Sequence, residues 1–237
     1  MKIGVFLCGE VAPELLPEHG PYSAMFESMF ADFSKQIHLK FYDALLLQIP
    51  KDVDECDGYI ISGSKFSVYD SEEWISALGD FVVKLFNENK KTLGICFGHQ
   101  LIAHALGGEV IKSPKGWGVG VSIHQVVNKP LWFHGSDSNS DQLSLLVSHQ
   151  DQVVSLPKDA QVIALSEFCP YSIIAIEPYF LGIQGHPEFS KSFSQGLMQH
   201  RRDDIGEIAY PKGMSSLSLP VNSKEIVQSI VNFLLSE

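Results

Sequence analysis

Apolar residues recur along the chain with two spacings, one typical of buried strands and the other of amphipathic helices. Short, mainly apolar runs predict strands at 1–8, 37–41, 59–62 and 179–184. Apolar residues three and four positions apart predict helices over 22–33 and 72–87. Strands that alternate with helices are typical of an α/β fold with a parallel central sheet.

The pattern changes between residues 109 and 177, where apolar runs look like strands and no clear helix separates them. These runs are 119–127, 144–148, 162–166 and 172–176. We expect them to form a small antiparallel patch laid over the parallel sheet. The polar, turn-rich stretch 135–142 predicts an exposed loop, which is either a lid or a passive surface insertion.

The C-terminal part is predicted in two pieces. Residues 201–220 mix polar and apolar positions without a clear period, so we expect an irregular connection there. The final helix is expected to start at Asn222, where Glu225 would complete a capping box, and to bury Ile226 and Ile230. A chain of 237 residues suits one α/β domain, and we expect a single domain over 1–237.

Candidate chemistry begins at Cys96, which lies where an apolar strand turns sharply into a predicted helix over 98–106. Gly94 and Gly98 flank it, as a nucleophile elbow requires, because the nucleophile's backbone is strained and a Cβ on either side would clash. The positive end of the helix dipole favours the thiolate, which is the form that attacks carbonyls. A buried structural cysteine is the alternative interpretation.

A second stretch of the sequence favours the catalytic interpretation of Cys96. The short strand at 179–184 runs directly into Gly185-His186-Pro187-Glu188. A strand end can present the His186 imidazole together with the Glu188 carboxylate that orients it, which is the arrangement a nucleophile requires of its base. The two stretches together predict a cysteine nucleophile with a histidine base.

The two motifs also carry a family resemblance. GICFGHQ around Cys96, followed 90 residues after its cysteine by the histidine of GIQGHPE, resembles the class I (triad) glutamine amidotransferase family. The similarity extends to residues 60–64 and 148–153 and covers nearly the whole chain. Within the family, the chain is most similar to the stand-alone γ-glutamyl-peptidase-like branch.

The resemblance implies a flavodoxin-like three-layer αβα fold and a set of site residues. Cys96 would be the nucleophile, His186 the general base and then acid, and Glu188 the partner of the imidazole. The backbone amides of Ser64 and Phe97 would form the oxyanion hole. Four residues would hold the α-amino and α-carboxylate groups of the substrate: Gln100, Ser148, Gln150 and Asp151.

Two positions depart from the family pattern. The chain reads Gly63-Ser64-Lys65 where many members read Gly-Gly-Pro, so one glycine and a rigid proline are lost from the oxyanion turn. It has Gln150 where many members have glycine, which could alter what fits behind the γ-glutamyl group. His149 borders this loop, and its ring either contacts the substrate or braces the loop.

These features predict a cysteine hydrolase that cleaves the γ-amide of a γ-glutamyl group, in glutamine or in a γ-glutamyl peptide such as glutathione. One alternative is a glutaminase subunit that delivers ammonia to a separate synthetase. Another is a non-catalytic member that uses the pocket to bind a ligand. We expect no cofactor, because the chain has no phosphate-binding glycine loop, and no metal site, because His99 and His104 are five residues apart.

Composition narrows the partners. A formal charge of −11 without a dense Lys/Arg block argues against nucleic acid or an anionic membrane. The cysteines are scattered, which is typical of a reduced, cytoplasmic protein: Cys8, Cys56, Cys96 and Cys169. The N-terminal apolar run is too short for a signal peptide, and no run approaches the roughly 20 apolar residues that span a bilayer.

Overall fold

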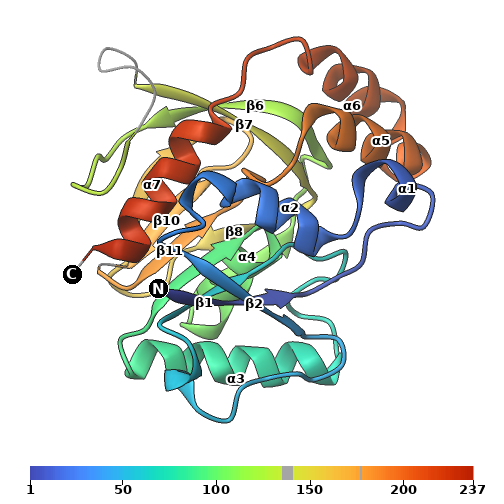
Figure 1. The fold of residues 1–237 in the computed structure, drawn as a ribbon. Coiled ribbons are helices and arrows are strands. Elements are labelled where there is room, and N and C mark those ends of the chain that lie inside the picture. The colour runs from blue at the N-terminus through green and yellow to red at the C-terminus, as the bar shows by residue number, and fades with distance from the viewer. Residues whose placement is uncertain (135–140, 177, 237) are drawn as a thin grey trace.

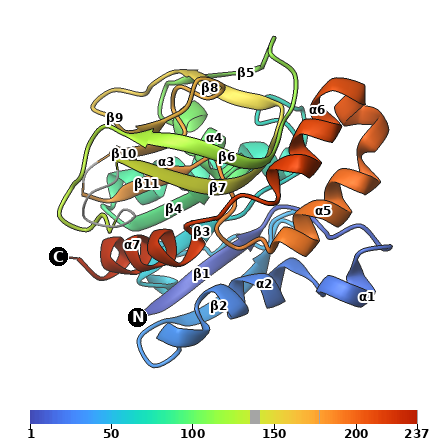
Figure 2. The ribbon, with the colours of Figure 1, turned by 90° about the horizontal axis from the view of Figure 1, so that it is seen from above.

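The computed structural model describes residues 1–134, 141–176 and 178–236. Within these ranges, five parallel strands occupy one half of a large central sheet: β1 (Lys2–Leu7), β2 (His38–Asp43), β3 (Gly58–Ile61), β4 (Lys91–Ile95) and β11 (Phe180–Ile183). β1 lies beside β2 (Figure 1), and the five strands follow the order β2-β1-β3-β4-β11 (Figure 2). The four strands predicted from mainly apolar runs are therefore confirmed, and all of β3, β4 and β11 is buried.

The other half of the sheet is antiparallel. In the described chain four strands continue from β11 in the order β10-β9-β6-β7: β6 (Gly118–Val126), β7 (Gln142–His149), β9 (Gln161–Leu165) and β10 (Ile173–Ile176). The prediction that these runs lie over the parallel sheet is wrong, because the β10–β11 hairpin pairs Ile173 with Ile183 and so extends the same sheet sideways. The small antiparallel sheet is instead formed by β5 (Glu109–Lys112) and β8 (Asp151–Ser155).

Helices cover both faces of the central sheet, so the predicted three-layer α/β fold is confirmed (Figure 2). One face packs against α3 (Glu73–Asn87) and α4 (Phe97–Ala105). The opposite face packs against α2 (Tyr22–Met29) and α7 (Ser223–Leu235). The helix predicted over 22–33 is thus α2 followed by a short 3-10 turn at Ala31–Phe33. Two further short elements are α1 (Leu16–His19) and a 3-10 turn at Val53–Glu55.

Residues 201–220 are largely helical, which corrects the prediction of an irregular connection. After α5 (Lys191–His200), α6 covers Arg202–Ser216 with a kink at Gly206, whose φ is 80°. The helix is held by contact with β6, because Gly213 allows close approach and the Ser216 hydroxyl accepts the Val121 N–H at 2.8 Å. Few of its side chains are buried, so the sequence carries no apolar stripe that would reveal it.

The ends of two helices are set in different ways. Gly107 adopts a φ of 93° after α4, the left-handed conformation in which glycine commonly ends a helix. The last helix follows Asn222 and buries Ile226 and Ile230 as predicted, but its capping box is not formed. The Asn222 side chain instead accepts the Ser144 N–H at 2.9 Å and ties the helix start to β7.

The predicted loop at 135–142 lies outside the described residues except for its last two. Gln142, the last of these, already belongs to β7. Across the described residues, none of the helices has both the length and the apolar composition needed to cross a bilayer.

Candidate active site

Cys96 occupies a strained turn between β4 and α4. Its φ and ψ are 52° and −100°, a backbone conformation that residues with a side chain rarely adopt. Such strain costs about 1–3 kcal/mol and persists only where the surrounding structure enforces it, most often at functional sites. The predicted strain at this cysteine is therefore present.

Glycines enforce the close packing around this turn. A Cβ at Gly94 would lie 2.4 Å from the Gly98 carbonyl, and a Cβ at Gly98 would lie 2.2 Å from the Ile61 carbonyl oxygen. Both distances are prohibitive, so the prediction that small residues are required on both sides of Cys96 is confirmed. Gly63 has a similar role in the turn after the neighbouring strand β3, because a Cβ there would lie 2.9 Å from Cε1 of His186.

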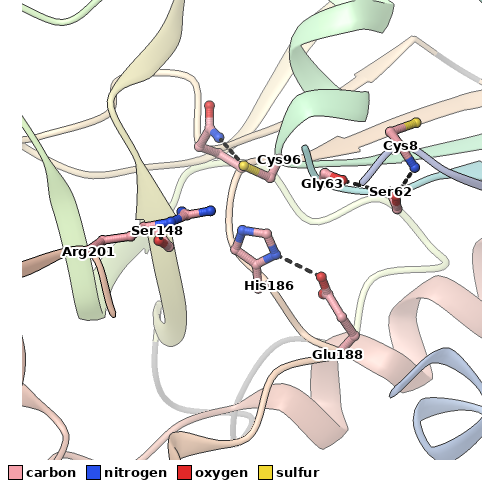
Figure 3. Close-up of polar contacts among 9 residues, drawn as sticks. Cys8, Ser62, Gly63, Cys96, Ser148, His186, Glu188 and Arg201 are labelled. Carbon is pink, nitrogen blue, oxygen red and sulfur yellow. Dashed lines mark hydrogen bonds and ion pairs between the residues drawn. The ribbon is translucent and has the colours of Figure 1, made fainter. Parts of the chain in front are cut away.

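His186 and Glu188 form a buried pair next to this turn. His186 Nδ1 and Glu188 Oε1 are 2.7 Å apart, and the two side chains are 5% and 2% exposed. The imidazole also stacks on the Phe189 ring, with centroids 3.9 Å apart and planes 5° from parallel. In Figure 3 the imidazole lies between Cys96 and Glu188. The carboxylate and the stacked ring together fix the orientation of the imidazole.

The electrostatics of this pair favour a charged imidazole. Burial of the ring favours its neutral form, but the Glu188 carboxylate and the nearby Cys96 sulfur outweigh burial and raise the pKa of His186 to about 10. The ring therefore carries a proton at neutral pH. A protonated imidazole beside a sulfur nucleophile can supply that proton to a leaving group.

A cavity of about 610 Å³ opens in front of Cys96. The predicted site residues that line it are Ser64, Cys96, Gln100, Ser148, Gln150 and Asp151. A smaller adjoining cavity adds His186 and Glu188 to the same region. Phe97 differs, because its ring packs in the core 5.3 Å from Trp74. Its backbone N–H, in the first residue of α4, has no earlier helical turn to bond with.

Gln100 and His149 both brace the turn between β7 and β8. Gln100 Nε2 donates to the Asp151 carbonyl oxygen at 2.8 Å and to Gln184 Oε1 at 3.0 Å. His149 Nδ1 lies 2.9 Å from the same Asp151 oxygen, and burial lowers the pKa of His149 to about 4, so the ring is neutral. The bracing interpretation of His149 is thus favoured. Direct contact of Gln100 with substrate stays a prediction.

Three residues of the site escaped the sequence analysis. Phe189 stacks on the His186 imidazole, Gln184 Nε2 donates to Cys96 Sγ at 3.5 Å, and Arg201 donates to Ser148 Oγ at 3.3 Å. Arg201 lay in a segment expected to be irregular, so no element placed it at the cavity. Gln184 carried a signal, because it is a polar residue at the end of an otherwise apolar strand.

The cavity carries charges of both signs. Its basic residues include Lys65, Lys112 and Arg201, and its acidic residues are Glu10, Glu14, Asp151 and Asp204. A ligand that has both an ammonium and a carboxylate group would find complementary charges in it.

Comparison with known proteins agrees with these features. A model of the glutamine amidotransferase class-I family matches residues 20–200. Gamma-glutamyl peptidase 4 of Arabidopsis thaliana is 35% identical over 181 residues, which cover 73% of this chain and 70% of that protein. The glutamine-hydrolyzing GMP synthase of Aquifex aeolicus is 37% identical over 132 residues, which cover 55% of this chain and 24% of that protein.

A solved structure extends the agreement to the fold. The crystal structure of a glutamine amidotransferase from Thermotoga maritima matches with a TM-score of 0.74 and 18% identity, and the match covers 99% of this chain and 96% of that one. The family model and the plant relative confirm the resemblance predicted from the motifs around Cys96 and His186. The chain belongs to the class I glutamine amidotransferase family.

Proposed function

We propose that this chain hydrolyses the γ-amide bond of a γ-glutamyl group, with Cys96 as the nucleophile. The observation that carries the proposal is a strained cysteine that faces a buried His186–Glu188 pair at the base of a large polar cavity. A purely structural cysteine requires neither the strain nor the charged imidazole. Relatives named as peptidases and amidotransferases support a hydrolase.

The reaction would proceed in two steps. The Cys96 sulfur attacks the γ-carbonyl carbon, and His186 gives its proton to the departing amine as the C–N bond breaks. A glutamyl thioester remains on Cys96. His186, now neutral, takes a proton from water as the water attacks the thioester, which releases glutamate and regenerates the thiolate and imidazolium.

The oxyanion of each tetrahedral intermediate needs donors that are already in place. Phe97 supplies a backbone N–H from the first turn of α4, where the helix dipole also favours negative charge. Ser64 lines both cavities and would supply the second N–H. Each such donor is worth about 3 kcal/mol of transition-state stabilisation.

The charged groups of the cavity support recognition of the glutamyl end. Arg201 and Ser148, which are hydrogen-bonded to each other, would hold the α-carboxylate. Asp151 presents a carboxylate to the same cavity, where it would face the α-ammonium group. The cavity volume is in the range of about 300–1,000 Å³ that holds drug-sized ligands, so it has space for a leaving group larger than ammonia.

The second candidate function is a glutaminase that passes ammonia to a separate synthetase. It is favoured by the similarity to the glutamine-hydrolyzing GMP synthase of Aquifex aeolicus. The match covers 24% of the length of that enzyme. The γ-glutamyl peptidase interpretation is favoured by the plant relatives and by Gln150, which replaces a glycine common in glutamine-using members. In both cases the expected compartment is the cytoplasm.

Comparison of three substrates tests the proposal. We expect glutathione to be cleaved at its γ-bond with a kcat/KM at least equal to that of glutamine. An α-linked glutamyl dipeptide should not react, because its scissile carbonyl would be displaced from Cys96 and the oxyanion donors. Release of glutamate is measured, with Cys96→Ser as the control. Rapid glutamine hydrolysis without glutathione cleavage would favour the ammonia-donating function, and no glutamate from any γ-linked substrate would contradict both.

A further inference from the structure

Gln184 lies beside the nucleophile because the two strands that carry these residues are neighbours. β4 and β11 pair in parallel, and the Cys96 N–H donates to the Ile183 carbonyl oxygen at 2.8 Å. Gln184 and Cys96 therefore follow the ends of adjacent strands. The Gln184 side chain is fully buried, and its Nε2 donates to Cys96 Sγ at 3.5 Å, the dashed line at the sulfur in Figure 3.

The hydrogen-bond network fixes which end of each amide faces which partner. The carbonyl oxygen of Asp151 can only accept, so the Gln100 atom 2.8 Å from it must be the nitrogen. The same nitrogen contacts the Gln184 side chain at 3.0 Å, so that atom of Gln184 must be the oxygen. The amide nitrogen of Gln184 is then left to face Cys96 as a donor.

We propose that Gln184 is a positioning residue that holds the Cys96 sulfur as a hydrogen-bond acceptor and connects it, through Gln100, to the substrate-lining turn at residues 148–151. An N–H that points at a sulfur stabilises the thiolate relative to the thiol and restricts the sulfur to one position. The effect is strengthened by burial, because Gln100 is 3% exposed and Gln184 is fully buried. This inference rests on the proposed role of Cys96 but not on the identity of the substrate.

The same chain of hydrogen bonds couples the nucleophile to the cavity wall. Ser148, Gln150 and Asp151 line the cavity, and the Asp151 carbonyl oxygen receives both Gln100 Nε2 and the His149 ring. A movement of this turn would therefore pull on Gln100 and, through it, on Gln184. The structure links the part of the site that would recognise the glutamyl group to the atom that would attack it.

The pH dependence of Cys96 alkylation tests the proposal. Iodoacetamide labelling followed by mass mapping is carried out across a pH series on the full chain, its Gln184→Met variant and a matched Gln152→Met variant. Gln152 is also a buried glutamine, 4% exposed, but its side chain donates to Ser113 Oγ and not to Cys96. If the wild-type chain hydrolysed no γ-glutamyl substrate, the proposed function would be contradicted. This test would still apply, because iodoacetamide reacts with the cysteine without a glutamyl group.

We expect Gln184→Met to move the midpoint of the alkylation profile up by about one pH unit, and so to slow labelling about tenfold below the midpoint. Gln152→Met should keep the wild-type profile. Should Gln184→Met fail to fold, Gln184→Glu carries the test, because it matches the amide in shape and its carboxylate should raise the midpoint further. A folded Gln184 variant with the wild-type profile would overturn the proposal, as would an equal shift in Gln152→Met.

Discussion

Cys8 and Cys96 occupy equivalent places in the sheet and have different surroundings. Each follows a buried parallel strand, β1 or β4, at the same edge, and both are nearly inaccessible, at 0% and 5% exposed. Cys8 donates its S–H to the Phe6 carbonyl at 3.7 Å, whereas Cys96 accepts an N–H from Gln184 and faces a charged imidazole. Burial raises the pKa of Cys8 to about 12, which keeps it a thiol.

The comparison shows that a position at a strand end does not by itself distinguish the proposed nucleophile from a structural cysteine. Cys8 has an acceptor for its proton, which favours the thiol, and it lines neither of the two cavities at Cys96. Cys96 has a donor, a base and a strained backbone. Its partners come from the segment that follows β11, 88 to 92 residues away in the sequence, so the distinction is made by tertiary structure.

The strongest way to break this comparison is to exchange sulfur for oxygen at each position. Cys96→Ser should lower the rate of glutamate release by more than about 10⁴-fold, because a serine hydroxyl cannot be ionised by this site. Cys8→Ser should keep the wild-type rate, since its hydroxyl can still donate to the Phe6 carbonyl. Glutamate release and circular dichroism are measured on both variants. A fully active Cys96→Ser protein would contradict the assignment of Cys96 as the nucleophile.

The second test removes what Cys8 lacks, the acid–base partner. His186→Ala should lower kcat by about 10⁴-fold, and Glu188→Gln should leave a residual rate, because the carboxylate orients the base without touching substrate. The double variant should be no slower than His186→Ala alone. If the two losses multiplied, the residues would be acting independently, contrary to their 2.7 Å contact.

The smallest effect concerns the fold that holds both cysteines. Burial lowers the pKa of His99 to about 3 and those of His124 and His149 to about 4, against about 6.5 in the unfolded chain. Between pH 6.5 and about 4 the unfolded chain therefore binds protons that the folded chain does not. Each of these histidines should therefore lower the free energy of unfolding by about 1.4 kcal/mol for every unit by which the pH falls within that window.

Urea unfolding at pH 7.5 and pH 5 checks this expectation. His186 acts in the opposite sense between pH 7.5 and about 6.5, because its pKa of about 10 keeps the folded ring protonated while the unfolded ring is neutral; below pH 6.5 the ring is protonated in both states and adds nothing further. His124→Leu is the informative variant, since neither ring nitrogen of His124 has a hydrogen-bond partner among the described residues. This substitution should reduce the pH dependence of the free energy of unfolding by about the contribution of one histidine. Equal unfolding free energies at the two pH values would contradict the assignment of three neutral rings.

The sequence predicted the parallel half of the fold and the residues that face one another across it. Apolar runs and helical spacing are strong there because β3, β4 and β11 are buried on both faces. Cys96, His186 and Glu188 follow two of these strands, so local motifs were enough to predict that they meet. Their catalytic roles stay a prediction.

The remaining parts depend on contacts that no local pattern records. The kinked helix α6 buries little besides Ile205 and Gly213, and it is specified by its close approach to β6. Asn222 was expected to cap α7, but its side chain accepts a hydrogen bond from β7 instead, because the Ser144 N–H lies within reach in the folded chain. The orientation of the Gln184 amide is set by its hydrogen bond with Gln100, 84 residues away in the sequence.

The pairing of β4 with β11 also bears on how the protein becomes reactive during folding. Leu93 and Leu181 are register partners although 88 residues separate them, and such non-local strand pairs form late because a long loop must first be closed. Until that strand docks, Cys96 has neither the imidazole nor the amide beside it. On the proposed role of Cys96, a nascent or partly folded chain would carry no activated sulfur, which would spare it from oxidation and cross-linking before the native state is complete.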